Sequence, residues 1–106
     1  MPLIYHLALA RDWDDARRAG EYRVSTRGRT LDEVGFIHCS RTHQVAPVAA
    51  AFYAGVTGLV LLAIDPARLT SELRYEAGPG SDETFPHVYG PIDLAAVVSA
   101  SAYETP

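Results

Sequence analysis

Three of the four histidines in the chain lie within apolar stretches, where an imidazole can do acid–base chemistry near neutral pH. They are His6, His38 and His87. A neutral imidazole presents one donor and one acceptor, so burying it is costly unless both are paired. Three such residues in so small a protein suggest that they converge on one cleft as catalytic groups. The alternative is that each is a separately satisfied structural histidine or faces solvent.

Other polar side chains extend this candidate site as ligand-binding groups. Tyr5, Ser40 and Tyr89 each lie one or two residues from one of these histidines. Ser40 is either a helix N-cap or a ligand-binding hydroxyl. Arg74 and Glu76 alternate on a predicted strand and so share a face. These two side chains either clamp a ligand or pair with each other in solvent.

The remaining reactive residue types favour simpler interpretations. His43 lies at the start of a predicted helix and is expected to be exposed. Cys39 is not expected to form a catalytic pair with His38, because neighbouring side chains on a strand point to opposite faces. It is expected to be a small buried hydrophobic residue. Arg23, Arg27 and Arg29 are close in sequence and would hold a phosphate or an RNA end, or would lie in an exposed loop.

The hydrophobic pattern predicts a small α+β fold with a split, mainly antiparallel β-sheet and two helices. One helix is predicted after an N-cap at Asp12 and ends at Gly20, and the other begins near residue 46. A continuous apolar run over residues 59–64 predicts a central strand. Further strands are predicted over residues 3–8, 22–24, 35–40, 73–77 and 94–98. Loops are predicted over residues 25–33 and 78–84, and a turn over 65–69. An extended segment is predicted over 85–92 and a tail over 100–106.

Length and composition exclude several classes of protein. The 106 residues fit a single domain over 1–106, with a core over about 3–99. A net charge of −4 disfavours DNA as a partner, and the nine basic residues are all arginine, which excludes lysine chemistry. No apolar run approaches the ~20 residues of a membrane-spanning helix. No signal-peptide pattern is present either, so a cytoplasmic location is expected.

Four segments of the chain carry a family resemblance when taken together. They are Ile4-Tyr5-His6, Gly35-Phe36-Ile37-His38-Cys39-Ser40, Leu61-Leu62 with Ile64-Asp65-Pro66, and Phe85-Pro86-His87-Val88-Tyr89-Gly90-Pro91. Their combination resembles an uncharacterised bacterial family, domain-of-unknown-function family 952, over residues 3–99. The fold of that family is similar to the ADP-ribosyltransferase superfamily, in which a split α+β sheet grips NAD in a cleft.

This resemblance implies roles for individual residues. It places His6 on the ribose next to nicotinamide, and His38 with Ser40 on the ribose or the nicotinamide. His87, or else Tyr89, stands where classical transferases carry a catalytic glutamate. The resemblance therefore implies a nucleotide cleft for NAD or ADP-ribose, with NAD as substrate and with ADP-ribosyl or phosphoryl transfer as the reaction.

Two alternatives use the same residues. The first is a module that binds a small molecule or a partner without catalysis. The second is a metal site, since three histidine ligands with an open fourth position are typical of catalytic zinc. The spacing of the histidines is not diagnostic of such a site, because the ligands would come from distant segments.

Overall fold

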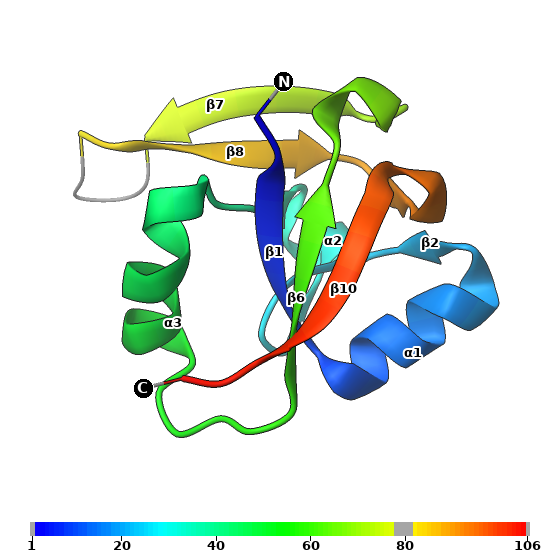
Figure 1. Ribbon diagram of the computed structural model, residues 1–106. Coiled ribbons are helices and arrows are strands. Elements are labelled where there is room, and N and C mark those ends of the chain that lie inside the picture. The colour runs from blue at the N-terminus through cyan, green and yellow to red at the C-terminus, as the bar shows by residue number, and fades with distance from the viewer. Residues whose placement is uncertain (1, 78–81, 106) are drawn as a thin grey trace.

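The computed structural model describes residues 2–77 and 82–105, and builds them around two three-stranded antiparallel sheets (Figure 1). The first sheet has the order β1-β6-β10, with β1 over Ile4–Leu9, β6 over Leu59–Ile64 and β10 over Val97–Tyr103. The second sheet has the order β5-β8-β7, with β5 over Ile37–His38, β8 over Thr84–Tyr89 and β7 over Glu72–Ala77. In Figure 1, β7 and β8 cross the top of the molecule, above β1, β6 and β10. The predicted α+β class with antiparallel strands is confirmed.

A β-bridge between Tyr5 and Ser40 joins the two sheets, and we call it the junction. The Tyr5 amide donates to the Ser40 carbonyl at 2.8 Å, and the Ser40 amide donates back to the Tyr5 carbonyl at 2.7 Å. This antiparallel bridge places β1 beside β5, so strand faces continue from one sheet to the other.

The central position predicted for residues 59–64 is confirmed. β6 pairs with β1 on one side and with β10 on the other, and Leu62 and Ile64 are fully buried. A strand with partners on both sides and cover on both faces must be apolar at successive positions, which accounts for the uninterrupted run.

Helix α1, over Ala10–Ala19, flanks the first sheet. It ends as predicted at Gly20, whose φ of 92° needs a residue without a Cβ. It begins three residues earlier than predicted, because Leu9 occupies the N-cap and Asp12 lies inside the first turn. An acidic side chain in the first turn still interacts favourably with the positive end of the helix. The acidic residue therefore predicted the helix correctly but not its first residue.

Helix α3, over Val45–Phe52, covers the other flank of β1 (Figure 1). The short 3₁₀ turn η1, over Thr42–Gln44, leads into it. Pro47 falls in the first turn of the α-helical part, where a missing amide hydrogen is best tolerated. Arg41 precedes η1 as its N-cap, so Ser40 does not cap this helix.

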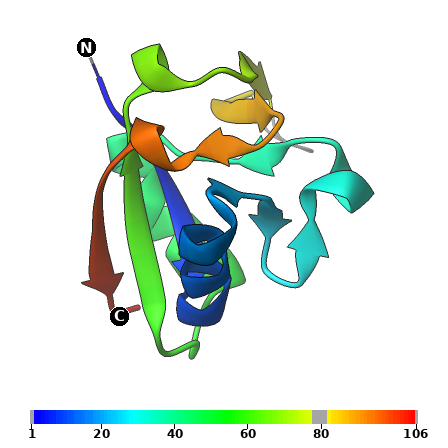
Figure 2. The ribbon, with the colours of Figure 1, turned by 90° about the vertical axis from the view of Figure 1, so that its right-hand side faces the viewer.

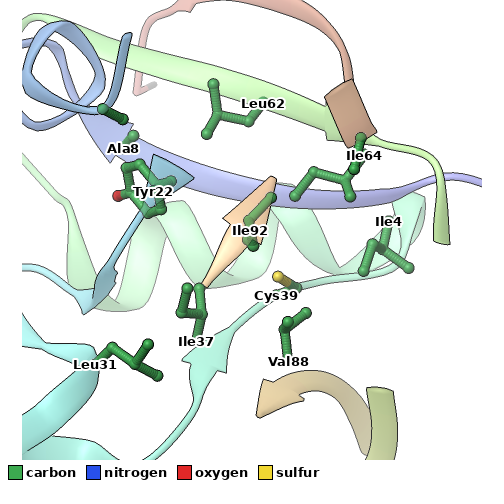
Figure 3. Close-up of a cluster of buried hydrophobic side chains, with 12 residues drawn as sticks. Ile4, Ala8, Tyr22, Leu31, Ile37, Cys39, Leu62, Ile64, Val88 and Ile92 are labelled. Atoms are coloured by element: carbon green, nitrogen blue, oxygen red, sulfur yellow. The ribbon is translucent and has the colours of Figure 1, made fainter. Parts of the chain in front are cut away.

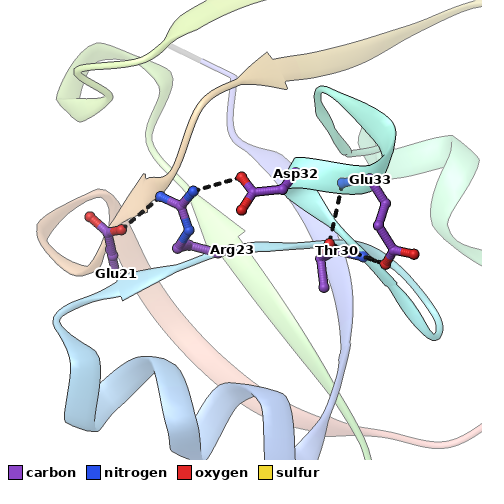
Figure 4. A network of polar contacts seen from close by, with 5 residues as sticks. All are labelled: Glu21, Arg23, Thr30, Asp32 and Glu33. Carbon is purple, nitrogen blue, oxygen red and sulfur yellow. Dashed lines mark hydrogen bonds and ion pairs between the residues drawn. The ribbon is translucent and has the colours of Figure 1, made fainter.

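Residues 25–33 do not form the predicted loop. Strand β3 over Val24–Thr26 and strand β4 over Arg29–Thr30 make a hairpin, and helix α2 over Leu31–Val34 follows. Thr30 caps α2: its hydroxyl accepts from the Glu33 amide at 3.3 Å, and Glu33 accepts from the Thr30 amide at 2.9 Å (Figure 4). This Thr-x-x-Glu capping box is the sequence signal that was overlooked. Figure 2 shows the hairpin and α2 on the side of the molecule opposite to β10.

The C-terminal part also departs from the prediction. Strand β2 over Glu21–Tyr22 pairs with β9 over Ile92–Asp93, and the 3₁₀ turn η3 covers Leu94–Ala96. Strand β10 then pairs with β6 as far as Tyr103 opposite Leu59, through most of the predicted tail. The small Ser and Ala residues of this segment show no alternating hydrophobic pattern, so no strand was predicted over them. They nevertheless pair with the edge of β6 that β1 does not occupy. The turn predicted over 65–69 is the 3₁₀ turn η2, over Pro66–Arg68. Within the loop predicted over 78–84, residues 78–81 lie outside the described residues.

The main hydrophobic core lies between the two sheets (Figure 3). Leu62 and Ile64 of β6 pack in one cluster with Ile37 of β5 and Val88 of β8. Cys39 is 1% exposed in this core, as predicted, and burial raises the pKa of its thiol. A second cluster lies between β1 and α3, formed by Leu7, Val45, Val48, Ala49, Tyr53 and Leu59. Among the described residues, no helix is long and apolar enough to cross a membrane.

The capping box gives a stability prediction. Thr30→Ala removes the hydroxyl that satisfies the Glu33 amide, so the free energy of unfolding should fall by about 1 kcal/mol in urea titrations. Thr57→Ala, at an exposed loop position, is the matched control and should change it by less than about 0.5 kcal/mol. Equal losses in the two variants would contradict the assignment of the cap.

Candidate functional site

His38 and His87 come together because β5 and β8 pair with these two residues opposite each other. Their ring centroids lie 5.3 Å apart. Directly paired residues of antiparallel strands project from the same face, so both imidazoles lie on one side of the second sheet. Two of the three histidines that the sequence singled out therefore share a site.

A carboxylate joins these histidines from the neighbouring strand. Glu76 of β7 accepts a hydrogen bond from His87 Nδ1 at 2.9 Å and another from the Tyr89 hydroxyl at 2.5 Å, both on Oε1. The bond from Tyr89, followed by the one from His87, lowers the pKa of Glu76, and the same contact raises the pKa of Tyr89. We call these three residues the Glu76 cluster.

The Glu76 cluster fixes how His87 carries its proton. A carboxylate only accepts hydrogen bonds, so His87 Nδ1 must be the donor. In the neutral ring, Nε2 then keeps its lone pair and can accept a proton from another group. A carboxylate that orients an imidazole in this way is the arrangement that general acid–base catalysis uses.

Arg74 does not pair with Glu76, contrary to one of the two interpretations of the sequence. Its guanidinium donates to Glu72 at 2.7 and 3.2 Å and lies over the ring of Tyr89, 4.4 Å from the centroid. Glu76 is instead bonded to His87 and Tyr89 through Oε1. The Arg74 side chain is half exposed, so a positive charge borders the Glu76 cluster.

Aromatic rings enclose the two histidines. Phe36 stacks on His87 with centroids 4.1 Å apart, and Phe85 lies 5.2 Å from His38 at a tilt. Burial, and then the proximity of His87, lowers the pKa of His38 to about 4. His38 is therefore a neutral hydrogen-bonding group at pH 7 rather than a cation.

Two hollows border His38. A groove of about 250 Å³ is lined by Ser25, Thr26, Val34, Phe36, His38 and Phe52, and we call it the Ser25 groove. A small cavity of about 20 Å³ adjoins it through Thr26, His38 and Phe52, and reaches Tyr5 and Ser40. The predicted ligand-binding residues Tyr5 and Ser40 thus lie beside His38, but in a space little larger than one water molecule.

The ring of His6 takes no part in the face shared by His38 and His87. Along β1, Ile4 and Ala8 belong to the core between the sheets, whereas Leu7 packs against α3. His6 follows the core side and is 3% exposed, although it borders the small cavity. The sequence could not choose between the faces, because β1 is covered on both. The convergence expected for three histidines is therefore seen for two.

Both ring nitrogens of His6 are used inside the protein. Nδ1 donates to the His38 carbonyl at 2.7 Å, and Nε2 accepts from the Tyr22 hydroxyl at 2.9 Å. Burial lowers the pKa of His6 to about 4, which agrees with a neutral ring in this tautomer. His6 thereby holds the backbone of β5 next to the junction.

The other candidate residues lie apart from this site. His43 is exposed, as expected, and its Nε2 lies 3.1 Å from Glu83. Arg23 is already paired with Glu21 and Asp32, at 3.0 and 2.9 Å (Figure 4), which leaves it poorly placed to hold a phosphate.

Arg27 and Arg29 also lie apart from the face that His38 and His87 share. Arg27 borders a different groove beside Arg11, and Arg29 is exposed. Within residues 2–77 and 82–105, no group of three or more His, Cys, Asp or Glu side chains is arranged to hold a metal ion.

Sequence reasoning missed five residues of the site, namely Ser25, Thr26, Val34, Phe36 and Phe52. Ser25 and Thr26 lie in the segment that was predicted as a loop. The sequence signal next to their hairpin is the capping box of helix α2, which directly follows it. Phe52, at the end of α3, is 62% exposed although its side chain is large and apolar.

The neutral state of His6 predicts how stability changes with pH. Its pKa is about 4 in the folded protein and about 6.5 when unfolded, so the unfolded state binds more protons between these values. The stabilisation is complete above pH 6.5 and is lost as the pH falls towards 4, by about 3 kcal/mol for this residue. NMR titration of the His6 ring should show no protonation above about pH 5. A midpoint near 6.5 would contradict the buried, doubly bonded ring.

Comparisons with known proteins agree on a family. Three solved structures of protein CC0527 from Caulobacter crescentus are similar to the chain. A crystal structure shares 32% sequence identity, with a TM-score of 0.84 over 96% of this chain and 86% of that one. A crystal structure of a double mutant gives 31% and 0.83 over the same shares of the two chains. The solution NMR structure gives 33% and 0.80 over 98% and 86%.

No curated protein matches the chain. None of the similar structures is described as an ADP-ribosyltransferase, so that part of the resemblance stays a proposal. The family described as "Protein of unknown function (DUF952)" matches residues 7–100, which is most of the chain. The chain therefore belongs to the DUF952 family, as its four sequence segments suggested.

Proposed function

We propose that the protein binds a nucleotide-like small molecule of the NAD or ADP-ribose type on the face that His38 and His87 share, and that it transfers an ADP-ribosyl or phosphoryl group from that ligand. The observation that carries the proposal is the Glu76 cluster beside His38: Glu76 bonds to both His87 Nδ1 and Tyr89. Phe36, which stacks on His87, lines one groove together with His38, so aromatic rings and a neutral imidazole face a ligand of this type there.

In ADP-ribosyl transfer, an acceptor hydroxyl forms a bond to C1′ of the ribose as the bond from C1′ to nicotinamide breaks. The nicotinamide leaves as a neutral molecule with the electron pair of that bond. Nε2 of His87 takes the proton of the acceptor hydroxyl, and the carboxylate of Glu76 stabilises the resulting imidazolium. His38, neutral at pH 7, hydrogen-bonds the ribose hydroxyls.

Glu76 supplies the carboxylate of this mechanism, although it lies on β7 and not on the strand of His87 and Tyr89. The family resemblance left His87 or Tyr89 where transferases carry a glutamate, and no carboxylate followed on that strand. Glu76 contributes one from β7, within hydrogen-bond distance of both residues. In this scheme His6 is a positioning residue rather than a ribose ligand, since its nitrogens bond to His38 and Tyr22.

Phosphoryl transfer is the second reaction that this face supports. The Arg74 guanidinium lies beside Tyr89, at the border of the Glu76 cluster, and is half exposed. A guanidinium is well suited to a phosphate, although Arg74 would first have to exchange its contacts with Glu72.

The second candidate function is binding without catalysis. The observation in its favour is the cover on His87, whose side chain is only 7% exposed beneath the ring of Phe36. A substrate reaches Nε2 of His87 only if that cover moves. Measuring binding and turnover separately distinguishes this module from an enzyme.

Binding is tested by NMR titration with ADP-ribose and with NAD while the histidine ring resonances are followed. We expect shifts centred on His38 and His87. Glu76→Ala should weaken binding by on the order of tenfold, because it frees both groups that the carboxylate orients. Glu104→Ala, at an exposed position after β10 and away from the Glu76 cluster, is the matched control and should bind as the wild type does. The absence of shifts at millimolar ligand would contradict the proposal, as would equal losses in both variants.

Turnover is tested by incubating the protein with NAD and measuring the release of free nicotinamide. The wild-type protein should release it, and His87→Ala should not, at a temperature at which circular dichroism shows both proteins to be folded. Binding of NAD without any release would establish the non-catalytic module instead.

A further inference from the structure

Ser25 carries a buried hydroxyl that the fold itself does not use. The residue is 1% exposed at the centre of β3. Among the described residues, its Oγ is the buried side-chain polar atom without a hydrogen-bond partner. Leaving such a group unpaired costs stability, so native proteins rarely retain one without a reason. Ser25 is one of the residues that line the Ser25 groove. Rotation about its single side-chain torsion changes the direction in which the hydroxyl points.

The walls of the Ser25 groove are aromatic and uncharged. Phe36 precedes β5 on one side, and Phe52 at the end of α3 is 62% exposed although its side chain is large and apolar. Val34 and Thr26 complete the walls with the ring of His38, and none of the described residues that line the groove carries an ionised side chain. An exposed phenylalanine at the rim of such a groove offers a flat surface for stacking.

We propose that the Ser25 groove binds an uncharged, planar heteroaromatic ring, which stacks between Phe36 and Phe52 and places its hydrogen-bonding edge on the Ser25 hydroxyl and the His38 ring. A neutral ring suits walls that supply neither a cation nor a carboxylate. The inference rests on the proposed function in that the ring would be the adenine base of the nucleotide, which is neutral whereas the nicotinamide ring of NAD is cationic, and it adds the residue that selects the base.

The test uses Ser25→Ala in the full-length protein, with Ser99→Ala, at an exposed position of β10, as its matched control. Removing an unpaired buried hydroxyl should leave the unfolding midpoint of Ser25→Ala unchanged or higher. The dissociation constants of adenine and nicotinamide, measured by NMR titration, are the second readout. At least one of these neutral rings should bind the wild type at the Phe36 and Phe52 resonances, and Ser25→Ala should weaken it about tenfold. Ser99→Ala should change neither quantity.

The charge of the ring is tested with nicotinate, which has nearly the shape of nicotinamide and a negative charge. Nicotinate should bind at least tenfold more weakly, because the groove would strip water from its carboxylate without offering a cation. Equal binding of the two would overturn the proposal. So would a lower unfolding midpoint for Ser25→Ala, which would show that the hydroxyl is structural, or an unchanged affinity for the neutral ring.

The same titrations separate this inference from the proposed function. Binding of ADP-ribose at His38 and His87, with neither free ring shifting Phe36 and Phe52, overturns the inference and leaves the proposed function standing. Binding of a free ring that depends on Ser25, with no response to ADP-ribose or NAD, supports the inference and overturns the proposed function.

Discussion

The junction between β1 and β5 is the constraint on which the rest of the structure depends. Two backbone hydrogen bonds between Tyr5 and Ser40 join the two sheets, and His6 adds a third contact through the His38 carbonyl. Because His6 is neutral and its second nitrogen accepts from Tyr22, no charge is buried at this point. The three bonds fix the backbone at the His38 carbonyl and at Ser40, directly after β5. The pairing of β5 with β8 then places His38 opposite His87.

The candidate site combines groups from elements far apart in the sequence. β5 provides His38, β8 provides His87 and Tyr89, and β7 provides Glu76. Arg41 and Gln44 also tie the start of α3 to β8, since both donate to the Thr84 carbonyl, at 2.5 and 2.9 Å. The groove and the oriented base are therefore held by sheet pairing and helix docking together. Sites built on regular elements in this way keep their geometry without the ligand.

The sequence predicted the parts of the fold that depend on local pattern. The central strand, the helix end at Gly20 and the burial of Cys39 each follow from hydrophobic runs or from a single residue type. The position of Glu76 could not be predicted, because it depends on the register between β7 and β8, which no local signal sets. The face chosen by His6 was equally hidden, since β1 is apolar on both sides. Ser25 was missed with its hairpin, whose one clear signal was the capping box of the helix that follows.

The central claim is that Glu76 holds His87 with its proton on Nδ1 and leaves Nε2 free to accept a proton. Long-range ¹H–¹⁵N NMR on the wild-type protein at about pH 9, where histidine is ordinarily neutral, reports the tautomer of each ring directly. The structure predicts a single tautomer for His87, with the proton on Nδ1 and an unprotonated Nε2. A His87 ring protonated on Nε2, or one exchanging between both tautomers, would contradict the site described here.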